Sequence, residues 1–383
     1  MAFLKDGEIN RPNGCNGFDI VIGNPPYIRR TSINENDKKY YDRQYKSATK
    51  QYDMYLLFIE QGMNILNKKG HLCFINPIRF FNADYGFGCR KLLAENYTLK
   101  YVLDISQLPV FQNAMTYPCI LLVQKIKGSE IVYQKLQNLS EIEDVQCVKK
   151  IFTNYADILS DPDFKFIVDV TQELRSLIKK INSHSENISS LFDIARGLPN
   201  TKVDFAGNKY RAVKSTNVRK YFIEGELKTI NTDFADIFSQ EMIIMPRTVE
   251  YLQSMIKEKD IVCLDRIYYL IPTQKVNLKF VLGILNSRLT NFWFEFYYKT
   301  TKVQGNYFDL NGNQIGSIPL PNTSAEQQKP IIDLVDKILA AKKADSTADT
   351  AEMEREIDEK VYALYGLTAE EIAVVKGKTD CAL

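Results

Sequence analysis

The sequence predicts an α/β protein with a partial doubly wound domain, a mixed α/β domain and a helical tail. A chain of 383 residues is too long for one ordinary hydrophobic core. Strand-like and helix-like runs alternate up to about residue 136, which is typical of a doubly wound sheet of which only the later strands are present. Short strand-like runs with Asn-, Gly- and Lys-rich turns replace this pattern from about residue 190. The expected segments are 1–160, 161–189 (a helical connection), 190–322 and 323–383.

The first domain opens with FDIVIG at 18–23, which is short, apolar and β-branched and therefore predicts a buried parallel strand. Residues 53–68 place their apolar side chains on one side, which predicts a helix that Gly70 can close. Further strands are expected at 71–76, 101–105, 119–125 and 131–136, with a helix near 86–96.

The rest of the chain begins with a polar, helical connection at 165–183. One long helix is expected at about 278–298 in the second domain. In the tail, Ser324 with Gln327 and Thr368 with Glu371 have the spacing of capping boxes, so each pair predicts the start of a helix.

Composition excludes several classes of protein. The seven cysteines are an odd number without a CxxC pair, which indicates reduced thiols in a cytoplasm and no zinc site. With only two histidines, we expect no histidine metal centre and no Ser-His-Asp chemistry. No apolar run is long enough for a membrane span, and the first residues lack the apolar core of a signal peptide.

Charge is unevenly distributed along the chain. Residues 195–320 contain 17 lysines and arginines against 12 acidic residues, whereas 321–383 contain 8 against 13. The middle segment is therefore the part that would favour a polyanion, although ordinary surface variation gives differences of this size.

The most informative stretch is Asn24-Pro25-Pro26-Tyr27, directly after the first strand. Ligands of open α/β sheets bind beyond the carboxyl ends of strands, which is where Asn24 falls. The amide oxygen of Asn24 and the carbonyl of Pro25 are acceptors, and the two prolines stiffen the turn that holds them. With the Tyr27 ring beside them, they suit a planar base that carries an amino group. A generic Pro-Pro turn would instead only end the strand, and the tyrosine would only pack.

FDIVIGNPPYI resembles the catalytic motif of the gamma-class DNA amino-methyltransferases, which methylate the amino group of adenine from S-adenosylmethionine. GHLCFINPIRFF and LPVFQNAMTYPCILLVQK resemble the family's next segments. ARGLPN, KYRAVKSTNVRKYFI, LGILNSRLTNFWF and IGSIPLP follow in the order of the target recognition domain of TaqI-like and type IIG restriction-modification enzymes. The resemblance covers about residues 15–325, and its most specific part is the catalytic motif.

The resemblance implies that the target adenine flips out of double-stranded DNA. Tyr27 and Phe111 would then stack on its two faces. Asn24 and Pro25 would accept its amino hydrogens, and Pro26 would complete the rigid turn. The family places a glycine-rich cofactor site upstream of this motif, and only 23 residues precede Asn24. Asp19 and Asn24 are the remaining candidates for cofactor contact.

We therefore expect the chain to resemble the C-terminal part of a larger enzyme and to need a partner that carries the missing half, with or without a nuclease. The isolated chain is expected not to methylate DNA. A second hypothesis is a DNA specificity subunit whose partner supplies the chemistry. A third, an RNA or protein methyltransferase, would require the resemblance of the recognition domain to be a coincidence.

DNA contacts are expected from two segments of the recognition domain, because Lys and Arg neutralise phosphates while Gln and Asn read base edges. The candidates are Lys202, Lys209, Arg211, Lys214, Arg219, Lys220, Lys299, Thr300, Lys302, Gln304 and Asn306. For each lysine taken singly, an ordinary solvent-exposed position explains the residue as well as DNA contact does.

Overall fold

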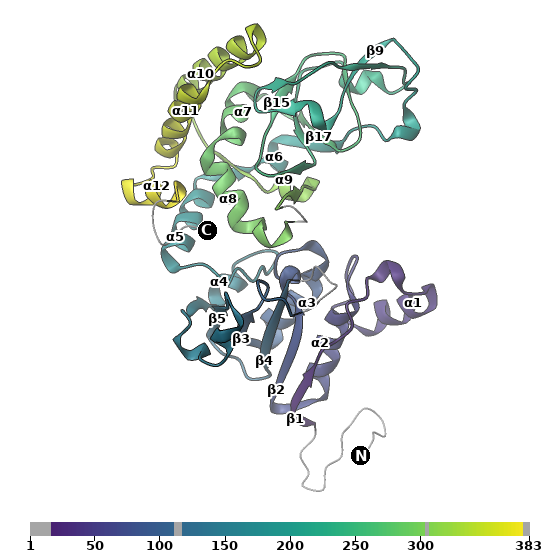
Figure 1. The fold of residues 1–383 in the computed structure, drawn as a ribbon, viewed down its shortest axis with the longest axis vertical. Helices are drawn as coiled ribbons and strands as arrows, with labels where there is room; N and C mark the ends of the chain where they lie inside the picture. Colours follow the sequence, from purple (N-terminus) through teal and green to yellow (C-terminus); the bar gives the residue numbers. More distant parts are fainter. Residues whose placement is uncertain (1–16, 111–116, 303–305, 378–383) are drawn as a thin grey trace. The chain divides into compact units, whose positions relative to one another are not determined.

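The computed structural model describes residues 17–110, 117–302 and 306–377 of the chain. The chain divides into two compact units, Met1–Gln172 and Glu173–Leu383 (Figure 1). No helix in the described ranges is both long enough and apolar enough to cross a membrane.

The first unit is built on one six-stranded sheet with the order β1-β2-β4-β3-β5-β6. Its strands are β1 (Phe18–Gly23), β2 (Leu66–Pro77), β3 (Thr98–Asp104), β4 (Pro118–Gln124), β5 (Glu130–Lys135) and β6 (Ile151–Asn154). β1 runs parallel to β2 and β3 runs parallel to β5, whereas the other neighbours are antiparallel. The strand predicted at 18–23 is therefore present and parallel, and the α/β class is confirmed. The prediction that this strand is buried is wrong, because β1 is an edge strand with no buried residue, and Ile20 and Ile22 are exposed.

One face of this sheet is covered by helices (Figure 1). The helices of the first unit are α1 (Glu35–Gln44), α2 (Met54–Ile65), α3 (Phe87–Asn96) and α4 (Tyr155–Leu159). Alternate strand residues such as Leu72, Phe74 and Leu121 are buried against α2, α3 and α4 in the main core. Period-two alternation explains why only every second strand residue joins this core.

The opposite face of the sheet is largely bare. Ile20 and Ile22 of β1 are 62% and 77% exposed, and Phe152 at the other edge is 47% exposed. Among the residues that the structure describes, only a small cluster around Ile105, Leu108 and Leu136 packs on this side. Parallel strands normally have both faces covered, so this apolar face is unusual for the fold class.

The second unit contains several small sheets and a layer of helices. Its strands are β7 (Ser185–Asn187), β8 (Phe192–Arg196), β9 (Tyr210–Val213), β10 (Val218–Arg219), β11 (Phe222–Ile223), β12 (Lys228–Ile230), β13 (Met242–Pro246), β14 (Thr248–Val249), β15 (Met255–Lys257), β16 (Ile261–Cys263), β17 (Ile267–Pro272), β18 (Phe308–Asp309) and β19 (Pro319–Pro321). The helices are α5 (Gln172–Ser183), α6 (Ile188–Leu191), α7 (Leu278–Asn286), α8 (Arg288–Tyr298), α9 (Gly312–Gly316), α10 (Ala325–Ala344), α11 (Ala351–Leu364) and α12 (Ala369–Val375). The sheets β15-β13-β17-β8 and β12-β9-β16 enclose a second core.

One feature of this unit differs from the sequence predictions. The single helix expected at 278–298 is two helices, because Ser287 has an extended backbone and its hydroxyl caps α8 by accepting from the amide of Thr290. The tail also packs within the second unit, where α10 contacts α7 and Glu371 of α12 forms an ion pair with Lys180 of α5. Both expected capping boxes, at Ser324 and at Thr368, are present.

Candidate active site and nucleic-acid interface

The Asn-Pro-Pro-Tyr turn lies at the carboxyl end of β1, as the sequence predicted. Asn24 and Pro26 are exposed, whereas Pro25 is buried and Tyr27 is half-buried. The turn therefore presents the Asn24 amide to solvent while Pro25 fixes it to the body of the unit. This combination offers a hydrogen-bond acceptor whose backbone is held in place in advance.

Tyr27 is fixed at both its hydroxyl and its ring. The hydroxyl donates a hydrogen bond to the carbonyl of Ile75 over 3.2 Å, which ties the turn to β2. The ring meets Tyr55 of α2 edge to face, with centroids 5.8 Å apart. Burial raises the pKa of Tyr27 to about 12, so the hydroxyl stays protonated and remains a donor. A ring held in this way can act as a stacking surface at small entropic cost.

Asp53, the residue before α2, is a titratable group beside the turn that the sequence analysis did not select. Its backbone forms an isolated antiparallel β-bridge with Arg29, which lies two residues after Tyr27. Burial raises its pKa to about 6, although the positive charges of Arg29 and Arg79 oppose the shift. Nothing in the local sequence indicates this burial, because it depends on how the segments fold together.

The segment between the turn and α2 also has a structure that the sequence analysis did not anticipate. Residues 29–52, which we call the basic arm, leave the turn, form α1 and return. The amide of Arg30 donates to the carbonyl of Tyr52 (3.0 Å), and the amide of Met54 donates to the carbonyl of Ile28 (2.8 Å). These two bonds close the base of the arm next to Tyr27.

The other first-unit candidates are not brought to the turn. Asp19 lies near the start of β1, five residues before Asn24, and its carboxylate accepts a hydrogen bond from the Asn67 side chain over 2.6 Å. Five residues of strand span roughly 16 Å, so this position does not support cofactor contact by Asp19 beside Asn24. Phe111 lies outside the described residues.

Several candidate DNA contacts of the second unit are held by other side chains. Arg219 forms an ion pair with Glu224, Lys220 with Glu354 (3.6 Å), and Arg211 with Glu258 (3.4 Å). Lys202 and Lys209 are exposed and lie over the rings of Phe234 and Tyr210, and the half-buried Lys214 lines a cavity of about 280 Å³. The last three are therefore the stronger candidates for phosphate contact in this group.

The second candidate segment lies between α8 and β18. Lys302 forms an ion pair with Glu295 over 2.7 Å and lies over the ring of Phe308, so it stabilises the loop. Lys299 is half-buried, and Asn306 is exposed with a positive φ of 65°. Gln304 and the side chain of Thr300 lie outside the described part.

Two parts of the chain are similar to families of restriction-modification proteins. Residues 2–111, with the turn, match the family described as Eco57I restriction-modification methylase. Residues 206–320 match the TaqI-like C-terminal specificity domain. The two matches follow in the order that the sequence resemblance implied, with the methylase match first and the specificity-domain match second.

Curated relatives are also restriction-modification proteins. The chain is 29% identical over 220 residues to the type II restriction enzyme and methyltransferase RM.Eco57I of Escherichia coli, which covers 56% of the chain and 20% of the relative. It is 34% identical over 108 residues to the type II methyltransferase M.BstVI of Geobacillus stearothermophilus, covering 28% of the chain and 19% of that relative. The chain thus spans about a fifth of the length of these relatives.

The fold is also shared with a solved structure. The type IIL restriction-modification enzyme MmeI, solved in complex with DNA, aligns with 94% of the chain and 56% of its own length, at a TM-score of 0.61 and 14% identity. At this identity the likeness concerns the fold alone.

Proposed function

We propose that the chain is the target-adenine and DNA-recognition part of a site-specific DNA adenine-N6 methyltransferase of a restriction-modification system. The observation that carries the proposal is the fixed Asn24–Tyr27 turn at the end of a parallel strand. An amino group placed there would donate one hydrogen to the Asn24 amide oxygen and the other to the Pro25 carbonyl. Both acceptors favour a nitrogen with more sp³ character, whose lone pair is then free for methyl transfer.

The base itself would have to leave the duplex to reach these acceptors. The half-buried ring of Tyr27, held by Ile75 and Tyr55, would stack on the flipped adenine with roughly 1–3 kcal/mol. No histidine is required for this chemistry. S-adenosylmethionine would supply the methyl group, as the family resemblance implies. Among the described residues Asp19 does not fit a cofactor contact beside Asn24, so we assign the chain no cofactor-binding residue except Asn24.

We further propose that the cofactor-binding half lies outside these 383 residues, whether on the same or on another polypeptide, and covers the exposed apolar face of the first unit's sheet. Among the described strands β1 pairs only with β2, so its outer edge is free to accept a further strand. Ile20 and Ile22 beside this edge are the apolar side chains that such a partner would bury. The curated relatives contain about four-fifths of their length outside the matched region, which is room for such a half.

The test is transfer of tritiated methyl from S-adenosylmethionine to adenine-containing duplex DNA. The chain would be assayed alone and mixed with the separately produced remainder of the E. coli relative. We expect methylation only from the mixture. Asn24→Ala should lower the rate by about 10²-fold or more, whereas Asn64→Ala, an exposed asparagine of α2, should not. Unchanged transfer by Asn24→Ala would contradict the assigned role of the turn.

The docking surface has its own control. Ile22→Glu places a charge in the proposed interface and should abolish the methyl transfer that appears on mixing. Ile237→Glu changes an exposed isoleucine of the other unit and should leave that transfer unchanged. Robust transfer by the chain alone would refute the need for a partner and leave the methyltransferase proposal standing.

A further inference from the structure

The basic arm that leaves the Asn-Pro-Pro-Tyr turn is unusually cationic for a first-unit segment. Residues 29–52 contain seven lysines and arginines against three acidic residues. Its helix, α1, contains no buried residue and projects from the rest of the unit (Figure 1). A helix without a fully buried residue gains little from the hydrophobic core, and its outward-facing side chains gain nothing from it.

The inner side of the arm is firmly anchored. Tyr41 and Tyr45 pack against the main core, and Arg30 forms an ion pair with Asp42 over 2.7 Å. Further along, the buried Ser47 donates through both its amide and its hydroxyl to the carboxyl of Glu60 in α2. The arm therefore holds a defined position relative to the turn, and α1 is capped by Asn34.

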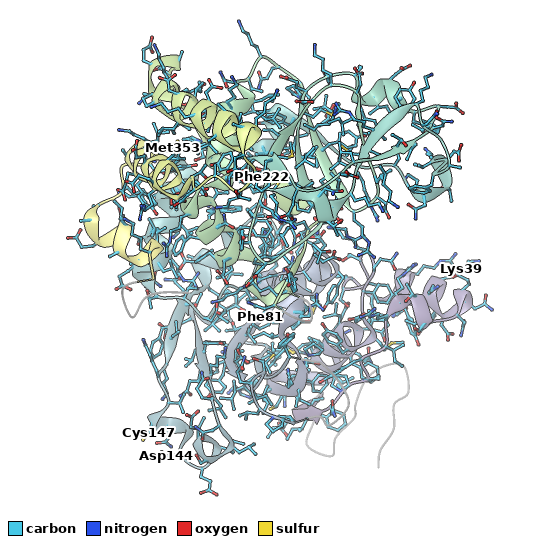
Figure 2. All side chains as sticks on the ribbon, turned by 45° about the horizontal axis from the view of Figure 1, so that its top comes forward. Lys39, Phe81, Asp144, Cys147, Phe222 and Met353 are labelled. Atoms are coloured by element: carbon cyan, nitrogen blue, oxygen red, sulfur yellow. The ribbon has the colours of Figure 1, made fainter. Side chains whose placement is uncertain are left out.

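The outer side of α1 carries a stripe of four residues, Asn36, Lys39, Tyr40 and Arg43. Their spacing of i, i+3, i+4 and i+7 places them on one face of the helix, and all four are exposed (Lys39 is labelled in Figure 2). Tyr40 is 59% exposed. Lys39 and Arg43 form no ion pair with any residue in the described ranges, whereas Lys38 on the same helix is paired with Glu35.

We propose that this stripe binds backbone phosphates of the DNA duplex beside the adenine held by the Asn24–Tyr27 turn. Lys39 and Arg43 would neutralise phosphates, and Asn36 and Tyr40 would donate to phosphate or sugar oxygens. The arm starts two residues after Tyr27, so a contact made by α1 fixes the duplex relative to the site of base flipping. The Tyr40 ring meets Tyr41 edge to face, with centroids 5.6 Å apart, which holds this exposed residue between the two cations on a helix anchored to the turn. The inference rests on the proposed function, because it takes DNA as the substrate.

The experiment measures binding of the full chain to a duplex of about 30 base pairs at several salt concentrations. Each phosphate contact contributes about 0.9 to the slope of log K against log salt. The double variant Lys39→Ala/Arg43→Ala should therefore lower the magnitude of the slope by about two and weaken binding at low salt by roughly 10-fold or more. Tyr40→Ala should weaken binding without changing the slope.

The matched control is Lys68→Ala/Lys69→Ala. These two exposed lysines lie near the start of β2, at the end of the sheet away from the turn, and should leave both affinity and slope unchanged. Thermal unfolding of the variants checks that the fold is intact, which we expect because α1 buries no side chain. An arm variant that binds like the parent overturns this inference and leaves the proposed function intact. Failure of the parent chain to bind any duplex overturns both.

Discussion

The carboxyl of Glu60 offers a sharp test of how the basic arm is held at the active site. Glu60 lies in α2 and is 5% exposed. It accepts hydrogen bonds from the amide of Lys46 (3.1 Å), the amide of Ser47 (2.8 Å) and the hydroxyl of Ser47 (2.7 Å). Glu60→Ala would remove the acceptor for all three donors while Ser47 stays buried.

The cost follows from those three donors. A buried donor left without an acceptor costs about 1–3 kcal/mol, and neighbouring losses are not fully additive. We therefore expect Glu60→Ala to lower the free energy of unfolding of the first unit by about 3–5 kcal/mol. Glu60→Gln keeps one acceptor oxygen and should cost about half as much. Because both variants loosen the basic arm, both should also weaken DNA binding, and Glu60→Ala should weaken it more than Glu60→Gln.

Urea unfolding can separate the two units, because the single tryptophan, Trp293, lies in the second. Circular dichroism should show a lower midpoint for the first unit, and tryptophan fluorescence should show an unchanged midpoint for the second. Glu95→Ala removes an exposed glutamate of α3, 4.0 Å from Lys91, and should change stability by less than about 0.5 kcal/mol. A loss below about 1 kcal/mol for Glu60→Ala would refute the reasoning.

Two further predictions concern buried charged groups. The pKa of Asp53 is raised to about 6 in the folded unit. The contribution of its carboxyl to the free energy of unfolding is therefore fully present below about pH 4 and is lost as the pH rises through 6. The variant Asp53→Asn does not lose this contribution. Its free energy of unfolding, compared with that of the parent, should therefore rise by about 1–2 kcal/mol from pH 4 to pH 7. Unfolding free energies that depend on pH in the same way in both proteins would contradict this. In the second unit Lys257 is fully buried and donates to the carbonyls of Phe238 (2.7 Å), Gln240 (2.8 Å) and Glu258 (3.1 Å). Lys257→Met should lower the free energy of unfolding of the second unit by about 3 kcal/mol. Only the urea midpoint measured by tryptophan fluorescence should shift. A shift in the midpoint of the first unit instead would contradict this role of Lys257.

The sequence predicted the elements whose signals are local. The strand at 18–23, the helix begun after Asp53 and the capping boxes at Ser324 and Thr368 all depend on neighbouring residues, and the structure contains each of them. The turn at Asn24 was found for the same reason, since a strand followed by two prolines and an aromatic is a contiguous pattern. The break at Ser287 was missed because an apolar stripe continues across it.

Which cations are free to meet DNA could not be predicted from the sequence. Lys220, Arg219 and Lys302 were selected by their type and position, yet each is paired with an acidic residue. Lys39 and Arg43 were not selected, although they are exposed and form no ion pair with any residue of the described ranges. The partner of Lys220 is distant in sequence, and the partners of Arg219 and Lys302 lie five and seven residues away, so the local conformation or the fold decides each pair and residue type alone does not predict it.

The sequence by itself determined the chemistry of the turn. Its acceptors and aromatic ring lie within four residues, and two prolines restrict the backbone between them, so their relative positions depend little on the rest of the chain. Tertiary structure alone decided what surrounds it. Contacts between residues 13 to 48 positions apart hold the Tyr27 ring and anchor the basic arm through Glu60, and the packing of the unit buries Asp53. It also left Ile20 and Ile22 on an uncovered face. Burial is a property of the packed sheet as a whole, and no short stretch of residues specifies it.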